Sequence, residues 1–183
     1  MKRLFLALPL SEAAAAQLWE NWEGLRFSSR RVKWIPQEYF HITMIFAGDT
    51  NEELIPDLVE VMEDTGSRYP SMEIETGGPG RFPPSGRPRV LFESVDQGGQ
   101  GVIRLQKHLV RHLSPLISVE RRKFIPHITT ARIRQHDTFR DDVLTGLPVT
   151  PVRDTLNSLV LFESILSPEG ARYYEVHTTE LTG

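Results

Sequence analysis

One tripeptide occurs twice in this chain, first as His41-Ile42-Thr43 and again as His127-Ile128-Thr129. Each copy lies in a stretch with the composition of a β-strand, and the two copies fall in different halves of the 183 residues. Side chains alternate across a strand, so the histidine and threonine of each copy face one side and the isoleucine faces the other. The repeat therefore predicts two related halves, each presenting one imidazole and one hydroxyl.

Strand-like and helix-like segments alternate along the whole chain, with no long low-complexity linker between them. Strands are expected at residues 3–8, 31–34, 40–47, 72–76, 89–95, 126–133, 149–154, 157–165 and 172–178. Helices are expected at residues 12–26, 52–65, 102–116 and 137–145, with Ser11 capping the first. Residues 77–88 are rich in Gly and Pro, which predicts a loop. The pattern indicates an α+β protein with a single domain over residues 1–183.

The composition excludes several classes of protein. The chain has 21 Lys and Arg against 24 Asp and Glu, a formal net charge of −3, and no cysteine. Thiol nucleophiles, iron–sulfur clusters and cysteine-based zinc sites are therefore ruled out, and a cytoplasmic location is expected. An acidic chain is not a general nucleic-acid binder, so any RNA must be bound by a local patch.

No stretch reaches the roughly 20 apolar residues of a membrane span. The first ten residues imitate a signal peptide, but Pro9 and Glu12 interrupt that pattern, which favours a buried first strand.

Two imidazoles suit a displacement at phosphorus. A neutral one takes a proton from the attacking water, and a protonated one gives a proton to the departing oxygen. The ordinary histidine pKa near 6.5 lets both forms coexist near neutral pH. The threonine hydroxyls can hold the nonbridging phosphate oxygens. One His-x-Thr on a strand would more often be structural, whereas two copies on separate strands favour a catalytic interpretation.

The sequence resembles the two-histidine phosphoesterase superfamily, and within it the LigT-like RNA 2′,3′-cyclic phosphodiesterases. The hallmark of that family is a pair of His-x-Thr-x motifs, which read here His41-Ile42-Thr43-Met44 and His127-Ile128-Thr129-Thr130. The likeness extends over almost the whole chain, through residues 3–8, 40–48, 80–83, 89–92, 126–132 and 170–174. Two departures are Thr130, where the family commonly has Leu, and Ala47-Gly48-Asp49 in place of Leu-Gly-Glu.

The resemblance implies a bilobal, pseudo-twofold fold in which antiparallel sheets line a central cleft and helices lie outside. It also implies hydrolysis of an RNA 2′,3′-cyclic phosphate end to a 2′-phosphomonoester, without metal or other cofactor. Separately from the resemblance, a monomer is expected. His41 would be the proton donor and His127 the proton acceptor, while Thr43, Thr129 and Arg132 would bind the phosphate. Strict alternation puts Arg132 on the face opposite His127, so its role requires the strand to end or bulge first.

Three alternatives to this function stay open. The same site could serve a 2′–5′ RNA ligase, which runs the chemistry in reverse with a ribose hydroxyl in place of water. It could also serve a phosphodiesterase of small cyclic nucleotides. The third alternative is a protein that binds RNA ends without turnover.

Other residues have weaker signals. His108 and His112 have the i, i+4 spacing of a zinc site, but no third ligand is evident and two arginines flank them, so a solvated helix face is expected. The basic residues of the loop and its edge could admit RNA or simply be solvated; these are Arg81, Arg87 and Arg89. Core packing is expected for the aromatic residues near the motifs, although one could stack on a base; these are Trp34, Tyr39, Phe40 and Phe124.

Overall fold

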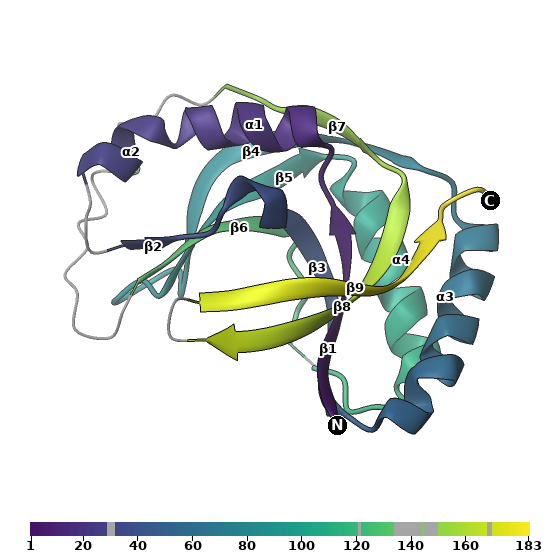
Figure 1. Cartoon of the computed structure of the whole chain (residues 1–183). Helices are drawn as coiled ribbons and strands as arrows, with labels where there is room; N and C mark the ends of the chain where they lie inside the picture. Colours follow the sequence, from purple (N-terminus) through teal and green to yellow (C-terminus); the bar gives the residue numbers. More distant parts are fainter. Residues whose placement is uncertain (29–31, 121, 134–143, 145–149, 168–169) are drawn as a thin grey trace.

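The computed structural model describes residues 1–28, 32–120, 122–133, 144, 150–167 and 170–183. Within them, nine strands form one antiparallel sheet in the order β7-β4-β5-β6-β3-β1-β8-β9, with β2 paired to β6 (Figure 1). The strands are β1 (Lys2–Pro9), β2 (Val32–Trp34), β3 (His41–Thr50), β4 (Met72–Phe82), β5 (Val90–Gln97), β6 (His127–Ile133), β7 (Arg153–Leu156), β8 (Ser158–Ser167) and β9 (Gly170–Glu180). The helices are α1 (Glu12–Asn21), α2 (Glu23–Ser28), α3 (Ile55–Arg68) and α4 (Gly99–Leu113), with short 3-10 turns η1 (Gln37–Tyr39) and η2 (Glu52–Leu54).

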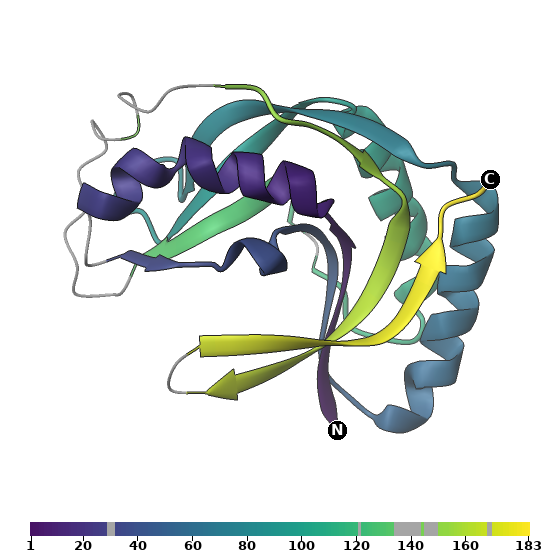
Figure 2. The same ribbon diagram turned by 45° about the horizontal axis from the view of Figure 1, so that its top comes forward.

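The sheet curls, and the helices cover its outer side in two groups, as Figures 1 and 2 show. Helices α3 and α4 pack on the half built from β1, β3, β8 and β9, and α1 lies over the half built from β4, β5, β6 and β7. Each half buries alternate apolar side chains beneath its helices, such as Leu6 and Leu8 on β1 and Leu91 on β5, all 0% exposed. The α+β, bilobal architecture expected from the sequence is confirmed, with one difference. The two halves share a single sheet because β3 pairs with β6.

Helix α1 begins where the sequence indicates, because the Ser11 hydroxyl accepts a hydrogen bond from the Ala14 amide at 3.2 Å. The expected helix at 12–26 is two helices, since Trp22 closes α1 before α2 begins. None of the helices in the described residues is long and apolar enough to cross a membrane.

The prediction of a loop over 77–88 is wrong for its first half, because β4 continues to Phe82. A Cβ on Gly80 would lie 2.4 Å from the Phe92 ring, so this glycine makes room for an aromatic side chain on the next strand. At Pro79, β4 pairs only with β5 among the described strands, so this part of β4 is a sheet edge. Proline is tolerated there because no second strand needs its missing N–H. Glycine and proline here serve close packing at a sheet edge and do not end the strand.

Other boundaries differ by a few residues. Helix α4 begins at Gly99 and ends at Leu113, three residues earlier at each end than expected. Strand β7 spans Arg153–Leu156, later than the expected 149–154, because it pairs with Met72–Glu75 of β4. The helix expected at 137–145 lies outside the described residues except for Leu144.

The threonine hydroxyl at position 130 is buried without a hydrogen-bond partner among the described residues. An unpartnered buried hydroxyl destabilises a fold because it has left water without replacing the lost bond. We expect Thr130→Val to raise the free energy of unfolding by about 1 kcal/mol, measured as a higher urea midpoint at unchanged slope.

Thr76→Val is the matched control. The Thr76 hydroxyl is equally buried but accepts a hydrogen bond from the Val152 amide at 3.0 Å, so its loss should lower the midpoint. A lower midpoint for Thr130→Val as well would show that the Thr130 hydroxyl has a partner.

A buried carboxyl lies beneath α1. The Trp22 indole N–H donates to Glu93 Oε2 at 3.0 Å, and only 3% of Glu93 is exposed. Burial raises its pKa from 4.5 to about 7, against the opposing effect of hydrogen bonds from Trp22, Gly78 and Thr76. Between those two pH values the folded protein therefore holds a proton that the unfolded chain has released.

Because the folded state binds the extra proton, this group's contribution to stability is lost as pH rises from about 4.5 to about 7. We expect Glu93→Gln, which keeps an acceptor for Trp22, to gain stability relative to the parent protein over that window. Urea unfolding of both proteins at several pH values measures the difference. A difference that does not vary with pH would contradict the assignment.

Candidate active site

The two His-Ile-Thr copies lie on adjacent antiparallel strands, with Ile42 of β3 paired directly to Ile128 of β6. Both isoleucines are 0% exposed and face the helix-covered core. The histidines and threonines consequently share the opposite face, and all four are half-buried. Continued antiparallel pairing on either side of Ile42 and Ile128 would set His41 toward Thr129 and Thr43 toward His127 on that face. The arrangement has a local twofold axis through the isoleucine pair.

Each imidazole is tethered in the same way. His41 Nδ1 lies 2.7 Å from the carbonyl oxygen of Tyr39, and His127 Nδ1 lies 2.7 Å from that of Ile125. A carbonyl oxygen only accepts, so Nδ1 carries the hydrogen in both rings and Nε2 of the neutral ring is the acceptor. Nε2 of His41 lies 3.0 Å from Oγ1 of Thr43, which donates to it. Both rings therefore offer Nε2 for proton transfer.

Aromatic side chains surround both histidines. His41 contacts Phe5 and Tyr173, with ring centroids 5.2 Å and 5.7 Å away. His127 contacts Phe82 and Phe92, at 5.0 Å and 5.2 Å. These rings come from four other strands, so no local sequence signal connects them to the motifs. They hold each imidazole and keep water from part of its surface.

The aromatic residues that the sequence places near the motifs serve mainly in packing. Phe40 is 2% exposed, Trp34 packs on Trp22 at 5.9 Å, and Phe124 lies against the core. Tyr39 differs from these, because its ring meets that of Tyr173 at 4.9 Å beside His41.

The surroundings lower both histidine pKa values. Burial lowers the pKa of His41 to about 4; the hydrogen bond to Tyr39 opposes this, and the charges of His127 and Arg132 add to it. Burial also lowers the pKa of His127, with a further contribution from Arg132. Both values lie below the ordinary 6.5 on which the sequence-based expectation depends. Both rings of the free protein are therefore neutral near pH 7.

Arg132 reaches the same face as the histidines through a bulge. Leu91 of β5 pairs with Ala131, and Phe92 pairs with Thr129, so Thr130 is an extra residue in β6. After the extra residue, the side chains of β6 alternate between the two faces in the opposite sense. Arg132 pairs with Val90, and Val90 lies on the same face as Phe92 because the two are two residues apart in β5. Arg132 therefore shares the face of His127 and Thr129. The arginine is exposed, and its charge acts on His41, His127 and Tyr173.

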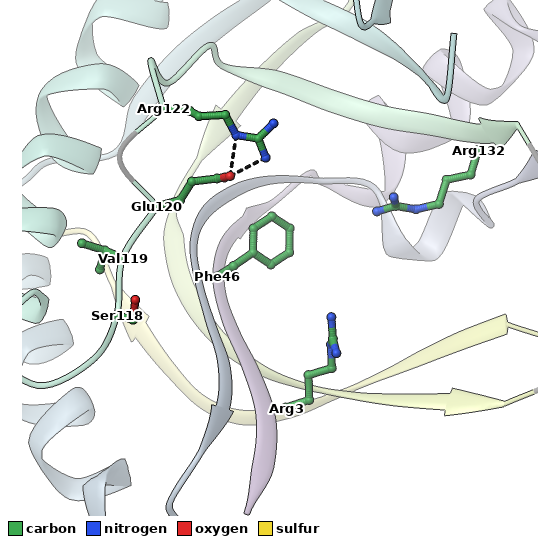
Figure 3. A pocket seen from close by; sticks show the side chains of 7 residues that line it. All are labelled: Arg3, Phe46, Ser118, Val119, Glu120, Arg122 and Arg132. Carbon is green, nitrogen blue, oxygen red and sulfur yellow. Dashed lines mark hydrogen bonds and ion pairs between the residues drawn. The ribbon is translucent and has the colours of Figure 1, made fainter. Parts of the chain in front are cut away.

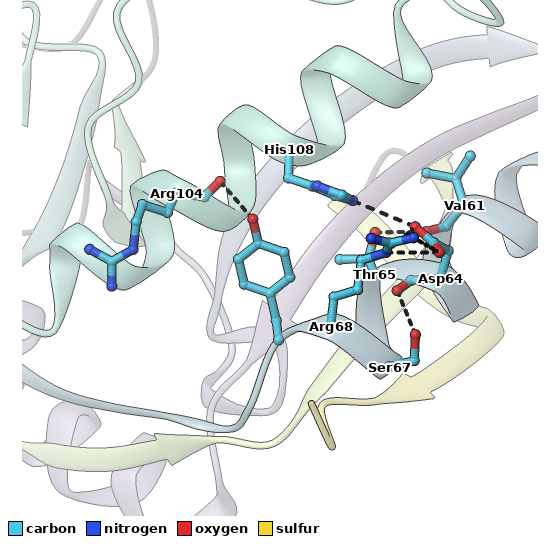
Figure 4. Close-up of polar contacts among 8 residues, drawn as sticks. Val61, Asp64, Thr65, Ser67, Arg68, Arg104 and His108 are labelled. Atoms are coloured by element: carbon cyan, nitrogen blue, oxygen red, sulfur yellow. Dashed lines mark hydrogen bonds and ion pairs between the residues drawn. The ribbon is translucent and has the colours of Figure 1, made fainter.

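The second histidine pair lies on α4, and Figure 4 shows its first member, His108, pointing toward Asp64 of α3. The rings of His108 and His112 are 4.3 Å apart, and His108 Nε2 is 3.9 Å from Asp64, which also pairs with Arg68. Among the described residues no group of three or more His, Cys, Asp or Glu side chains could hold a metal ion.

Arg81 and His177 each have polar partners of their own. The guanidinium of Arg81 is used locally, since it donates to the carbonyl oxygens of Pro83 and Gly86. His177 pairs with Glu63 at 2.6 Å on the outer side, and His136 lies outside the described residues.

Comparisons with known proteins agree with this geometry. The chain matches the 2′-5′ RNA ligase superfamily over residues 12–165. A protein of Thermus thermophilus named RNA 2′,3′-cyclic phosphodiesterase is 30% identical over 188 residues, covering 99% of this chain and 91% of the relative. A protein of the same name from Thermotoga maritima is 24% identical over 181 residues, covering 99% and 96%.

Solved structures show the same fold. The Thermus thermophilus protein TT0787 superposes with a TM-score of 0.85 at 29% identity, over 99% of this chain and 98% of the other. Escherichia coli LigT in complex with 3′-AMP superposes with a TM-score of 0.80 at 22% identity, over 100% and 99%. The extent of the match and the paired histidine strands lead to one conclusion: the chain belongs to the 2′-5′ RNA ligase superfamily and has its two-histidine phosphoesterase fold.

Proposed function

We propose that the chain hydrolyses the 2′,3′-cyclic phosphate at an RNA end to a 2′-phosphomonoester by paired-histidine acid–base catalysis, without a metal. One observation supports this most strongly. The Ile42–Ile128 pair brings two imidazoles, each held through Nδ1 by a backbone carbonyl oxygen, onto one face together with two threonine hydroxyls. The names of the relatives, RNA 2′,3′-cyclic phosphodiesterase, support the choice of substrate.

In the proposed reaction, Nε2 of His127 takes a proton from the water that attacks phosphorus. Nε2 of His41 gives a proton to the 3′ oxygen as its bond to phosphorus breaks. Once Nε2 of His41 is protonated it no longer accepts from Thr43, so the hydroxyls of both Thr43 and Thr129 donate to the nonbridging oxygens and keep the water, phosphorus and leaving oxygen in line. The Arg132 guanidinium offsets the negative charge of the phosphate. The assignment of donor and acceptor follows the family resemblance.

His41 must carry a proton for this reaction, although its pKa in the free protein is about 4. A phosphate anion beside the ring favours the charged imidazolium and raises that pKa. Proton uptake by His41 and substrate binding are therefore coupled, and the enzyme holds its acid in the active form only when the anion is in place.

We further propose that residues 1–183 form a single bilobal catalytic domain, each lobe contributing one His-x-Thr strand, and that the protein acts as a cytoplasmic monomer. The continuous sheet across both halves supports one domain, and the lack of cysteine is compatible with a reducing compartment.

Replacing either histidine tests the reaction. We expect His41→Ala and His127→Ala each to lower kcat on a cyclic-phosphate oligonucleotide by at least about 100-fold, because each removes one proton-transfer step. Far-UV circular dichroism should stay unchanged. The matched control is His112→Ala, an exposed histidine on α4, which should keep parental activity. Parental rates in either site variant would exclude the mechanism.

Product analysis separates the alternatives. The parent protein, assayed in EDTA, is given a cyclic-phosphate oligonucleotide, a cyclic mononucleotide, or the oligonucleotide together with a 5′-hydroxyl RNA. A 2′-phosphate on the oligonucleotide supports the proposed hydrolase, hydrolysis of the mononucleotide alone favours the phosphodiesterase of small cyclic nucleotides, and a joined RNA favours the ligase. Binding without any product would support the non-enzymatic alternative.

The pH dependence tests the coupling of proton uptake to binding. The profile of kcat/KM reports the free enzyme, in which His41 and His127 both have lowered pKa values, so we expect its optimum below pH 6.5. The profile of kcat reports the complex, in which the phosphate raises the pKa of His41, so its optimum should lie at higher pH. The limbs belong to the coupled pair of histidines. Coincident optima would contradict proton uptake on binding.

A further inference from the structure

Two cationic side chains lie directly opposite each other on the histidine face. Lys33 of β2 pairs with Arg132 of β6 in the antiparallel register. The residues before and after the arginine, Ala131 and Ile133, are buried in the core. Alternation therefore turns Arg132 to the open face, and Lys33 shares that face because directly opposed residues of two strands point the same way.

This pair of like charges lacks a counterion. Like charges on directly opposed residues repel each other, because their Cβ atoms are only about 5 Å apart. Neither Lys33 nor Arg132 forms an ion pair with a carboxylate among the residues that the structure describes. An anion bound between the ammonium and the guanidinium would relieve the repulsion and be attracted by both charges.

The surroundings of Arg132 leave room for such an anion. Arg132 lines a pocket of about 500 Å³ (Figure 3). The carboxylate in the lining of this pocket belongs to Glu120, and Figure 3 shows it paired with Arg122 and not with Arg132. The guanidinium of Arg132 therefore borders open space without a carboxylate of its own.

Lys33 reaches from one half of the molecule to the other. A Cβ on Gly170, the first residue of β9, would lie 2.9 Å from Lys33 Nζ, so the ammonium packs against this glycine. Figures 1 and 2 show β2 and the start of β9 on the same side of the molecule, at the left in both views. Lys33 is half-buried. Its four-carbon stem is flexible, so the ammonium can move from Gly170 to an anion held by Arg132.

We propose that Lys33 is a second cationic ligand of the phosphate group beside Arg132, and that the two cations bind the 2′-phosphomonoester product more tightly than the cyclic substrate. The cyclic phosphate carries one negative charge. Of the two hydrogens of the attacking water, one passes to His127 and the other stays on the new phosphate oxygen, so the product first forms as a monoanion.

The remaining proton of the product explains the preference. A phosphomonoester loses it with an ordinary pKa of about 6, and two nearby cations lower that pKa further, so the bound product is a dianion at neutral pH. A dianion gains about twice as much from each cation as the monoanionic substrate does. The product is therefore an inhibitor that competes with the substrate. This inference rests on the proposed function.

Removing the charge of Lys33 while keeping its stem tests the second ligand. The affinity of a nucleoside 2′-phosphate is measured by calorimetry near pH 8 for the parent, Lys33→Met and Lys33→Arg proteins. We expect Lys33→Met to weaken binding about 10-fold, because one charge-assisted contact is lost, and Lys33→Arg to restore most of the affinity, because the charge returns. The matched control is Lys107→Met, which removes an exposed lysine on α4 and should bind as the parent does.

The ionisation of the ligand tests the preference for the dianion. Near pH 5 the same ligand is mainly a monoanion, and halving its charge halves its Coulomb energy with Lys33. We therefore expect the loss of affinity in Lys33→Met to fall from about 10-fold near pH 8 to about 3-fold near pH 5. An equal loss at both pH values would contradict the preference.

Turnover gives a second measure of the same preference. On a cyclic-phosphate oligonucleotide, we expect Lys33→Met to raise KM about 3-fold and the inhibition constant of the 2′-phosphate product about 10-fold. A KM that rises more than the inhibition constant would show that the lysine favours the substrate.

Binding separates a failure of this inference from a failure of the proposed function, because calorimetry requires no turnover. Weaker binding of the nucleoside 2′-phosphate by Lys33→Met, but not by Lys107→Met, supports the second cation even if the parent protein hydrolyses nothing. Parental affinity of Lys33→Met at both pH values would overturn the inference. Hydrolysis that is abolished by His41→Ala would then leave the proposed function standing.

Discussion

The contact between Ile42 and Ile128 determines the rest of this structure. Each isoleucine belongs to the core of its own half, and their pairing joins β3 to β6 and so converts two helix-backed half-sheets into one. Burial of both side chains makes the register specific, because a slip of one residue would send an isoleucine to the open face and a histidine into the core. The position of both imidazoles is thus fixed by hydrophobic packing on the other side of the sheet.

Two bulges extend the same symmetry beyond the motifs. Met44 and Thr130 are each an extra residue immediately after the threonine, and each is buried. Without the bulges, strict alternation would turn Phe46 and Arg132 into the core, where a guanidinium would lack water or a partner. The bulges place Phe46 and Arg132 on the open face in place of Ile45 and Ala131, which are buried, and give the two halves different chemistry, a ring in one and a cation in the other.

The electrostatics of the site favour little charge on the histidines of the free protein. Packing against aromatic rings removes water from the imidazoles, and Arg132 adds a positive charge nearby, so both rings hold protons weakly. The same features suit an anion, since a phosphate would neutralise Arg132 and stabilise an imidazolium at the same time. Weak proton affinity in the free protein and attraction for phosphate therefore have one physical origin.

The sequence by itself determined the strands of the two motifs, the cap at Ser11 and the shared face of each His-Thr pair, because these follow from local periodicity and capping. It also identified Arg132 as dependent on a bulge. Only the tertiary structure decided the extension of β4 to Phe82, the aromatic rings around the histidines and the lowered pKa values. These depend on which strands are neighbours, as when Phe92 covers Gly80 and contacts His127, and residues that meet across a sheet are far apart in the chain. Phe46 shows the limit most clearly, since alternation alone assigns it to the core and one extra residue in the strand turns it to the surface.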